Sequence, residues 1–149
     1  MARFDMSGLD EIINRMRTLE SGAEDVERAM IEAGAREVAE AWKRAAEEHG
    51  LRDTGEMIES IGPGKIHKGG LIYCDIYPQG VDRKGVRNAE KAFRLHYGWS
   101  SFKATRWVDD ADAYSEATAV PAMAAVWEEF ISTGAAAGAG ASGIKTLKR

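Results

Sequence analysis

Apolar residues recur at helical spacing in two long parts of this chain and alternate along a short stretch between them. The first part begins with "SGLDEIINRMRTLE", in which Ser7 or Asp10 is a possible N-cap. Its apolar positions, spaced for one helix face, are Leu9, Ile12, Ile13, Met16 and Leu19. This pattern predicts a short amphipathic helix that breaks at Ser21-Gly22.

The stretch from Gly22 to about His49 predicts a second, longer helix. Its apolar stripe runs along an otherwise charged sequence and consists of Val26, Met30, Ala33, Val38, Trp42 and Ala45. Gly50 stands where such a helix is expected to stop.

Alternation in "LIYCDIYPQG", after "KIHKGG", predicts a tight hairpin that turns at Gly69-Gly70. One face would carry Leu71, Tyr73, Asp75 and Tyr77, and the opposite face, expected to meet the core, would carry Ile72, Cys74 and Ile76. The following "VDRKGVRN" is a polar, basic loop, expected to be mobile unless a partner holds it.

The second helical part spans about residues 108–131, after "AEKAFRLHYG", a stretch compatible with either a short helix or an extended edge. An acidic first turn suits the start of a helix, whereas Pro121 predicts a kink or two helices that meet near Ala119. The expected fold is α+β: long N-terminal helices and a C-terminal helix packed on a small antiparallel sheet. Residues 1–134 would form this single domain.

Residues 135–149 are rich in Gly and Ala and end in basic residues, so they predict a flexible C-terminal arm without a core of its own. We expect the arm to be held by a neighbouring protein. Its expected contact residues are Ile144, Leu147, Lys148 and Arg149.

Charge changes sign along the chain. Residues 1–60 contain 8 Lys and Arg against 15 Asp and Glu, and residues 61–107 contain 9 against 3. Residues 108–134 contain 0 against 6, and residues 135–149 contain 3 against 0. Alternating blocks suit copies that pack head to tail, although a solvated charged surface explains them equally well. The aromatic loop after the hairpin is the expected subunit interface, formed by Tyr97, Gly98, Trp99, Phe102, Arg106 and Trp107.

The connector "RDTGEMIESIGPGKI" between helix and sheet predicts a packing device rather than a catalytic loop. Thr54 can cap the short turn that follows, and Gly55 permits close backbone approach. Met57 and Ile61 lie four residues apart, so that one turn buries both. The five residues of this motif are Thr54, Gly55, Met57, Ser60 and Ile61.

The chain resembles the minor tail or tail-completion proteins of tailed bacteriophages with long non-contractile tails. The resemblance lies in this motif and in the order of the elements: a long helix, "TGEMIESI", a hairpin, "AFRLHYGWSSFKATRWVDDAD" and a closing helix. The resemblance covers about residues 8–132. A second family signature is matched only in part. Tyr97-Gly98 fits, but His96 replaces the family's acidic residue, Trp99 replaces its threonine, and Arg106-Trp107 replaces its Pro-Phe pair.

The resemblance implies a structural subunit of a phage neck or tail that forms a ring, with six copies expected, at the head-tail junction. DNA would pass through the lumen without specific binding, other neck and tail proteins would be partners, and the virion would be the final location. A tail terminator or a head-closure protein is the alternative. No membrane partner is expected, because the sequence has no apolar stretch long enough to span one.

Catalysis, metal binding and cofactor binding are not expected. The chemical candidates His49, His67, His96 and Cys74 do not form a recognised ligand pair or nucleophile-base set by their spacing. His49 is expected at a helix end and the other histidines in sheet or interface packing. A less favoured alternative is a small nucleic-acid-binding module, in which Trp99, Phe102 and Trp107 stack on bases among cations.

Overall fold

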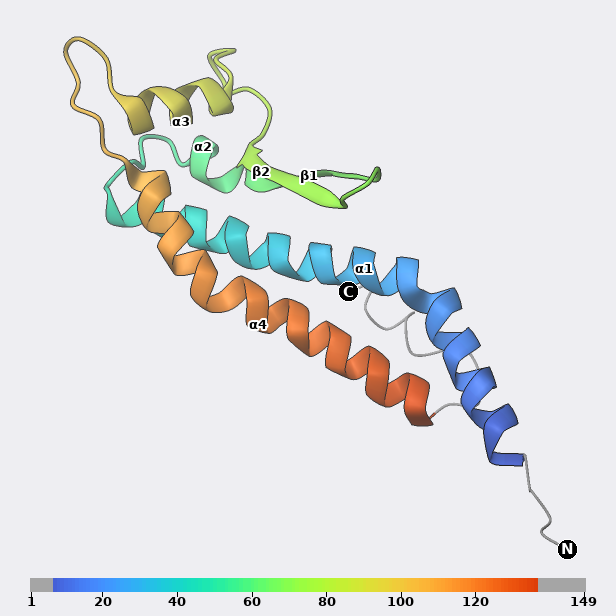
Figure 1. Cartoon of the computed structure of the whole chain (residues 1–149). Helices are drawn as coiled ribbons and strands as arrows, with labels where there is room; N and C mark the ends of the chain where they lie inside the picture. Colours follow the sequence, from blue (N-terminus) through green and yellow to red (C-terminus); the bar gives the residue numbers. More distant parts are fainter. Residues whose placement is uncertain (1–6, 137–149) are drawn as a thin grey trace, which may run out of the picture.

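Two long antiparallel helices dominate the molecule (Figure 1). The computed structural model describes residues 7–136 of the chain, and the side chains of residues 12–133. Helix α1 spans Ser7–Glu48 and helix α4 spans Trp107–Ala136. We call these two helices the stalk. Residues 51–106, which connect them, form the part that we call the head: α2 (Glu56–Glu59), β1 (Ile61–His67), β2 (Tyr73–Pro78) and α3 (Asn88–Tyr97). The α+β class is therefore confirmed.

The predicted break at Ser21-Gly22 is wrong, because α1 continues through it. The hydroxyl of Ser21 donates to the carbonyl of Thr18 at 3.0 Å within the helix, and Gly22 is buried. A glycine inside a helix costs about 1 kcal/mol relative to alanine. Packing against α4 offsets this cost, since Val26 and Val126 are buried in one cluster only a turn farther along.

Helix α4 likewise runs through Pro121 as one element, so the alternative of two separate helices is wrong. Pro121 lies on an exposed face of α4. Its ring therefore points away from the packed seam with α1, where apolar contacts hold the helix on both sides of the missing hydrogen bond. The helix also extends past residue 134, where the sequence places the start of the arm. The four expected arm contacts lie outside the described residues.

Strands β1 and β2 form a two-stranded antiparallel hairpin with an irregularity between Pro63 and Ile66. Its two faces are those that alternation predicts. Leu71, Tyr73, Asp75 and Tyr77 are exposed, whereas Ile72, Cys74 and Ile76 are half-buried. The hairpin lies along α1, to which an ion pair between Lys68 and Glu24 connects it.

The main core lies where the head meets the stalk. Buried residues of α1, α2, β1, α3 and α4 form one cluster: Ala39, Ala45, Ala46, Met57, Ile58, Ile61, Ala92, Trp107 and Ala111. Met57 and Ile61 are buried together, as their spacing predicts. The helix-to-sheet connector thus contributes apolar side chains to the core that joins the head to the stalk.

Gly55 has a φ of 87°, a left-handed conformation that favours glycine. The nearest atoms to an added Cβ would belong to the flexible side chains of Arg52 and Glu59, at 2.8 and 3.1 Å, rather than to backbone. As a cap Thr54 is weak: its hydroxyl accepts from the amide of Glu56 at 3.4 Å, and it donates to the carboxylate of Glu56 at 3.0 Å. The positive φ, more than capping or backbone proximity, is the specific demand of this turn.

Candidate interaction surface

The stretch after the hairpin is a helix, α3, and not an extended edge. Positions 90, 93, 94 and 97 are all exposed and share one face of α3. Phe93 and Tyr97 are 64% and 56% exposed, and their ring centroids lie 4.6 Å apart. On the same face, Arg94 forms an ion pair with Glu90 at 2.5 Å. An aromatic pair is therefore displayed to solvent on a short, charge-supported helix.

Gly98 ends α3 with a φ of 76°. An added Cβ would lie 2.6 Å from the carbonyl oxygen of Phe102 and 2.6 Å from the amide nitrogen of Ala104. These are backbone atoms, so only glycine allows the chain to turn back here. The motif Tyr97-Gly98 therefore has a steric basis in this fold.

Trp99 and Phe102 close the turn that Gly98 opens. Their backbones exchange two hydrogen bonds of 2.9 and 3.0 Å, and their rings stack with centroids 4.5 Å apart. Trp99 also donates from its indole nitrogen to the hydroxyl of Ser101 at 2.9 Å, yet it remains 50% exposed. The exposed tryptophan is thus held in one orientation by its own loop.

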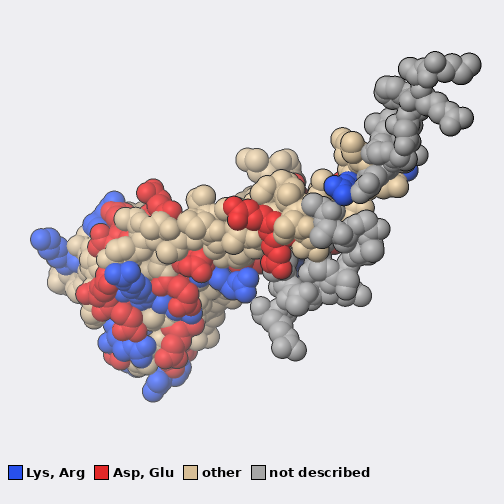
Figure 2. Space-filling model, turned by 90° about the horizontal axis from the view of Figure 1, so that it is seen from below, with Lys and Arg blue, Asp and Glu red and all other residues tan. Residues whose placement is uncertain are grey.

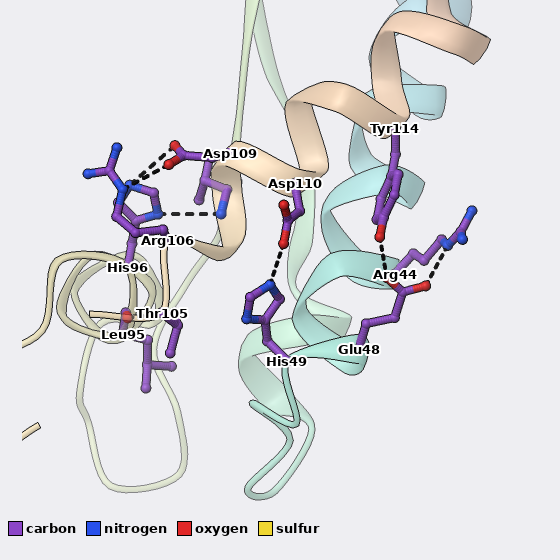
Figure 3. A network of polar contacts seen from close by, with 11 residues as sticks. Arg44, Glu48, His49, Leu95, His96, Thr105, Arg106, Asp109, Asp110 and Tyr114 are labelled. Atoms are coloured by element: carbon purple, nitrogen blue, oxygen red, sulfur yellow. Dashed lines mark hydrogen bonds and ion pairs between the residues drawn. The ribbon is translucent and has the colours of Figure 1, made fainter. Parts of the chain in front are cut away.

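Polar contacts fasten this loop to the rest of the head (Figure 3). The amide and hydroxyl of Thr105 both donate to the carbonyl of Leu95, at 3.1 and 2.7 Å. The amide of Val108 donates to Nδ1 of the buried His96 at 3.3 Å, so that this nitrogen carries no proton in the arrangement. Arg106 adopts a φ of 55° and donates from Nε to Asp109 at 2.8 Å.

The interface role predicted for Trp107 is wrong. Trp107 is the first residue of α4 and has 0% exposed surface, because it packs at the centre of the head core and meets Trp42 edge to face at 5.3 Å. Its indole nitrogen donates to the carbonyl of Ala92 at 3.5 Å. A neighbouring copy cannot reach this side chain, so it supports the surface from beneath.

A second set of polar contacts ties the end of α1 to the start of α4 (Figure 3). His49, one residue beyond α1, contacts Asp110 with 2.6 Å between Nε2 and Oδ2. Glu48 accepts from the hydroxyl of Tyr114 at 2.5 Å and from Nε of Arg44 at 2.8 Å. These hydrogen bonds, the one from Tyr114 foremost, lower the pKa of Glu48, and the same bond raises the pKa of Tyr114. The contact of His49 with Asp110 and the hydrogen bond from Tyr114 to Glu48 thus connect the end of α1 to the start of α4.

The loop of residues 81–87 is organised around Asp82, whereas the sequence predicts a mobile loop. Asp82 is 7% exposed and accepts hydrogen bonds from the amides of Lys84 and Val86, both at 2.8 Å. It also forms an ion pair with Lys91 of α3. The hydrogen bond from Lys91, with the two amides, lowers the pKa of Asp82 to about 2. The loop is therefore held by its own chain.

The structure brings the expected interface residues together only in part. Tyr97 joins Phe93 on the outer face of α3, with the guanidinium of Arg106 5.8 Å from the Tyr97 ring. Trp99 joins Phe102 in the adjoining loop. Two clefts of about 250 and 330 Å³ adjoin these aromatic residues: the first is lined by Trp42, Phe93 and Tyr97, and the second by Leu51, Leu95 and Trp99.

Sequence reasoning missed Phe93 and Asp82. The signal for Phe93 was its position four residues before Tyr97, which places both on one face once α3 is recognised as a helix. The signal for Asp82 was an aspartate followed three residues later by Gly85, a combination typical of a side chain that accepts hydrogen bonds from a tight turn.

The residues considered for catalysis have structural contacts. His67 stacks on Tyr73 with 4.8 Å between ring centroids, and its Nε2 lies 4.0 Å from Asp75. Cys74 is half-buried on the inner face of the hairpin, where burial raises the pKa of its thiol. Among the described side chains, no three or more His, Cys, Asp and Glu residues gather as they would around a metal ion.

The chain has no match among protein-family models, curated proteins or solved structures. Within residues 7–136, no helix combines the length and the apolar character needed to cross a membrane.

Proposed function

We propose that this chain is a structural subunit of a bacteriophage or prophage neck or tail, and that copies of it form a ring at the head-tail junction. The observation that supports ring formation is the fixed aromatic surface on the outside of the head. Phe93, Tyr97 and Trp99 are each at least half exposed, and the backbone beneath them is locked by Gly98 and Thr105.

Such a surface is suited to a protein partner. Exposed aromatic residues that are already ordered lose little conformational freedom on binding and contribute large apolar area. Tyrosine and tryptophan are also the residues most enriched at the energetic centres of protein interfaces. The charges around the surface are mixed: Arg94 is paired with Glu90, while Arg87 and Lys103 have no acidic partner among the described side chains.

The phage assignment rests on the Thr54-Gly55 motif, the order of the elements and the Tyr97-Gly98 pair, which resemble tail-completion proteins. In this proposal the chain performs no catalysis, and DNA passes through the ring without specific contacts. An acidic lumen would let DNA slide, because phosphates bind to cations and not to carboxylates.

A gene deletion in the phage or prophage that encodes this chain tests the proposal. Electron microscopy of the lysate should show filled heads and tails that fail to join or tails with an incomplete end, and the intact gene supplied in trans should restore infectivity. Normal virions without the protein would refute the assignment. A gene lacking codons 135–149, supplied in the same way, tests the expected role of the arm: the truncated subunit should fold but join particles poorly.

A further inference from the structure

The outer face of α4 carries a continuous apolar stripe that nothing in the described chain covers. Its members recur with alternating spacings of four and three residues, and they are Ala113, Ala117, Val120, Ala124, Trp127 and Ile131. All six are exposed, and for the three large ones the exposed fractions are 67% for Val120, 46% for Trp127 and 38% for Ile131. This spacing is that of a helix seam in coiled coils and helix bundles.

The stripe is distinct from the seam that α4 already uses. The seam with α1 lies on another side of the helix and includes Ala122, Val126 and Phe130. A helix that is apolar on more than one side normally lies inside a larger assembly. Figure 2, which views the molecule from the side of α4, shows a long uncharged stretch along the stalk, and residues 117–127 contain no charged side chain.

The first turns of α1 carry a matching uncovered stripe. Ile12 and Met16 are 54% and 64% exposed. They continue, at the same alternating spacing, the row of Leu19, Ala23, Val26, Met30 and Ala33. The latter part of this row packs against α4, whereas Ile12 and Met16 do not belong to either core cluster of the described residues. Among the described residues, this piece of the seam therefore has no partner helix.

We propose that these two stripes cover each other between copies, so that the first turns of α1 of one subunit lie on the outer face of α4 of the next. Their lengths fit: at about 1.5 Å per residue, Ser7 to Leu19 spans roughly 18 Å and Ala117 to Ile131 roughly 21 Å. The small side chains of Ala117 and Ala124 allow a second helix to approach closely between the larger Val120 and Trp127.

Charge selects this occupant over a second α4. The stripe is flanked on its two sides by Glu116 and Glu128, and neither has a cationic partner among the described side chains. Two α4 helices would bring these carboxylates together, which like-charge repulsion opposes. Residues 7–19 of α1, the segment proposed to dock, instead carry Arg15 and Arg17 against Asp10 and Glu11, and so have no net charge. A neutral, apolar segment thus meets an acidic, apolar one.

The contact is heterologous, because it joins different surfaces of the two copies and leaves each copy with one of its two surfaces still available. Repetition of such a contact produces a closed ring or an open filament. The inference rests on the proposed function, for which it names the partner surface. It also assigns a use to the stalk that is separate from the aromatic surface of the head.

Two matched substitutions on α4 test the stripe. Ala124 lies in it and the adjacent Ala125 lies beside it, and both are exposed, so Ala124→Asp and Ala125→Asp make the same change without disturbing the core. We expect Ala124→Asp to weaken self-association, measured by sedimentation, about tenfold or more, because it buries an unpaired carboxylate. Ala125→Asp should leave association within about twofold of the unchanged protein. Equal effects of the two would overturn the proposal.

Thiol cross-linking identifies the occupant. In a Cys74→Ser background, a protein with Met16→Cys is mixed with one of three proteins carrying Val120→Cys, Ala124→Cys or Trp127→Cys, and a short bifunctional thiol reagent is added. We expect cross-linked dimers in at least one mixture and none from any protein alone. Dimers from an α4 variant alone would show that α4 pairs with α4, and dimers from Met16→Cys alone would show that α1 pairs with α1; either result overturns the proposal.

The outcomes also separate this inference from the proposed function. Oligomers in sedimentation without cross-links in any mixture would refute the stripe contact and leave ring assembly intact. A monomer at every concentration would refute both the contact and self-assembly of the isolated subunit.

Discussion

The head and the stalk of this protein are held together in different ways. The head relies on specific devices: Gly98 at a turn that no other residue fits, Asp82 at the centre of a loop, and the fully buried Trp107. The stalk relies on repetition, with small and medium apolar side chains at regular helical spacing. Contacts within the chain therefore order the turns and loops of the head. The stalk instead leaves apolar rows of α1 and α4 exposed among the described residues.

Two tryptophans show the same difference. Trp107 contributes its whole side chain to the core of its own subunit, while Trp127, twenty residues farther along the same helix, is 46% exposed. A buried tryptophan stabilises the fold, whereas an exposed one beside Val120 and Ile131 is available to a partner. In the proposed assembly, the same helix therefore serves folding at its start and association along its outer face.

Replacement of Trp107 should have the largest effect on stability. Trp107→Ala removes a fully buried aromatic side chain and leaves a cavity, so we expect the free energy of unfolding to fall by about 3–5 kcal/mol. Urea denaturation followed by circular dichroism measures this change. The control Trp127→Ala should cost about 1–2 kcal/mol, because nearly half of that residue is already in water. Similar losses for the two variants would remove the distinction between a folding tryptophan and an association tryptophan.

Gly98→Ala should destabilise the head by about 2–4 kcal/mol, since it adds a backbone clash to an unfavourable φ. Gly85→Ala is the matched control: Gly85 has a φ of 78°, but an added Cβ there would meet no atom within 4 Å. The control should therefore lose only about 1 kcal/mol, the cost of the conformation alone. Thermal unfolding of both variants isolates the clash, and equal losses would show that the loop yields to accommodate it.

Gly55→Val should cost about 1–3 kcal/mol, because a branched residue is unfavourable at positive φ. The loss should be smaller than that of Gly98→Ala, since the atoms nearest to the new side chain are the movable ends of Arg52 and Glu59. An unchanged melting temperature would mean that the connector does not need the left-handed turn.

Asp82 should make the stability of the head depend on acidity. Its folded-state pKa of about 2 is below the ordinary value of about 3.9, so the carboxylate stabilises the fold above pH 4 and this contribution is lost as the pH falls from about 4 towards 2. At pH 6 we expect a lower melting temperature for Asp82→Asn than for the unchanged chain. The difference should shrink over that acidic window. A difference independent of pH would show that the charge of Asp82 is not what matters.

Much of this fold follows from the sequence because helix and strand periods are local. The hairpin faces and the burial of Met57 with Ile61 depend only on spacing, and the structure confirms them. The break at Ser21-Gly22 was wrong because local propensity was outweighed by packing against a helix about a hundred residues away. Trp107 could not be distinguished from Trp99 by sequence, since both are aromatic residues in one short basic segment. Only the path of the chain through Gly98 decides which of them faces the solvent.

Self-assembly is the central claim, and the mass of the particle in solution tests it most directly. Sedimentation equilibrium of the intact chain over a wide concentration range should reveal a closed oligomer, with six copies expected. Trp99→Ala should dissociate it while lowering the free energy of unfolding by only about 1–2 kcal/mol, because the side chain is half exposed and outside the core, although it stacks on Phe102. A monomer at all concentrations, both alone and together with neck and tail proteins of the same phage, would contradict the account.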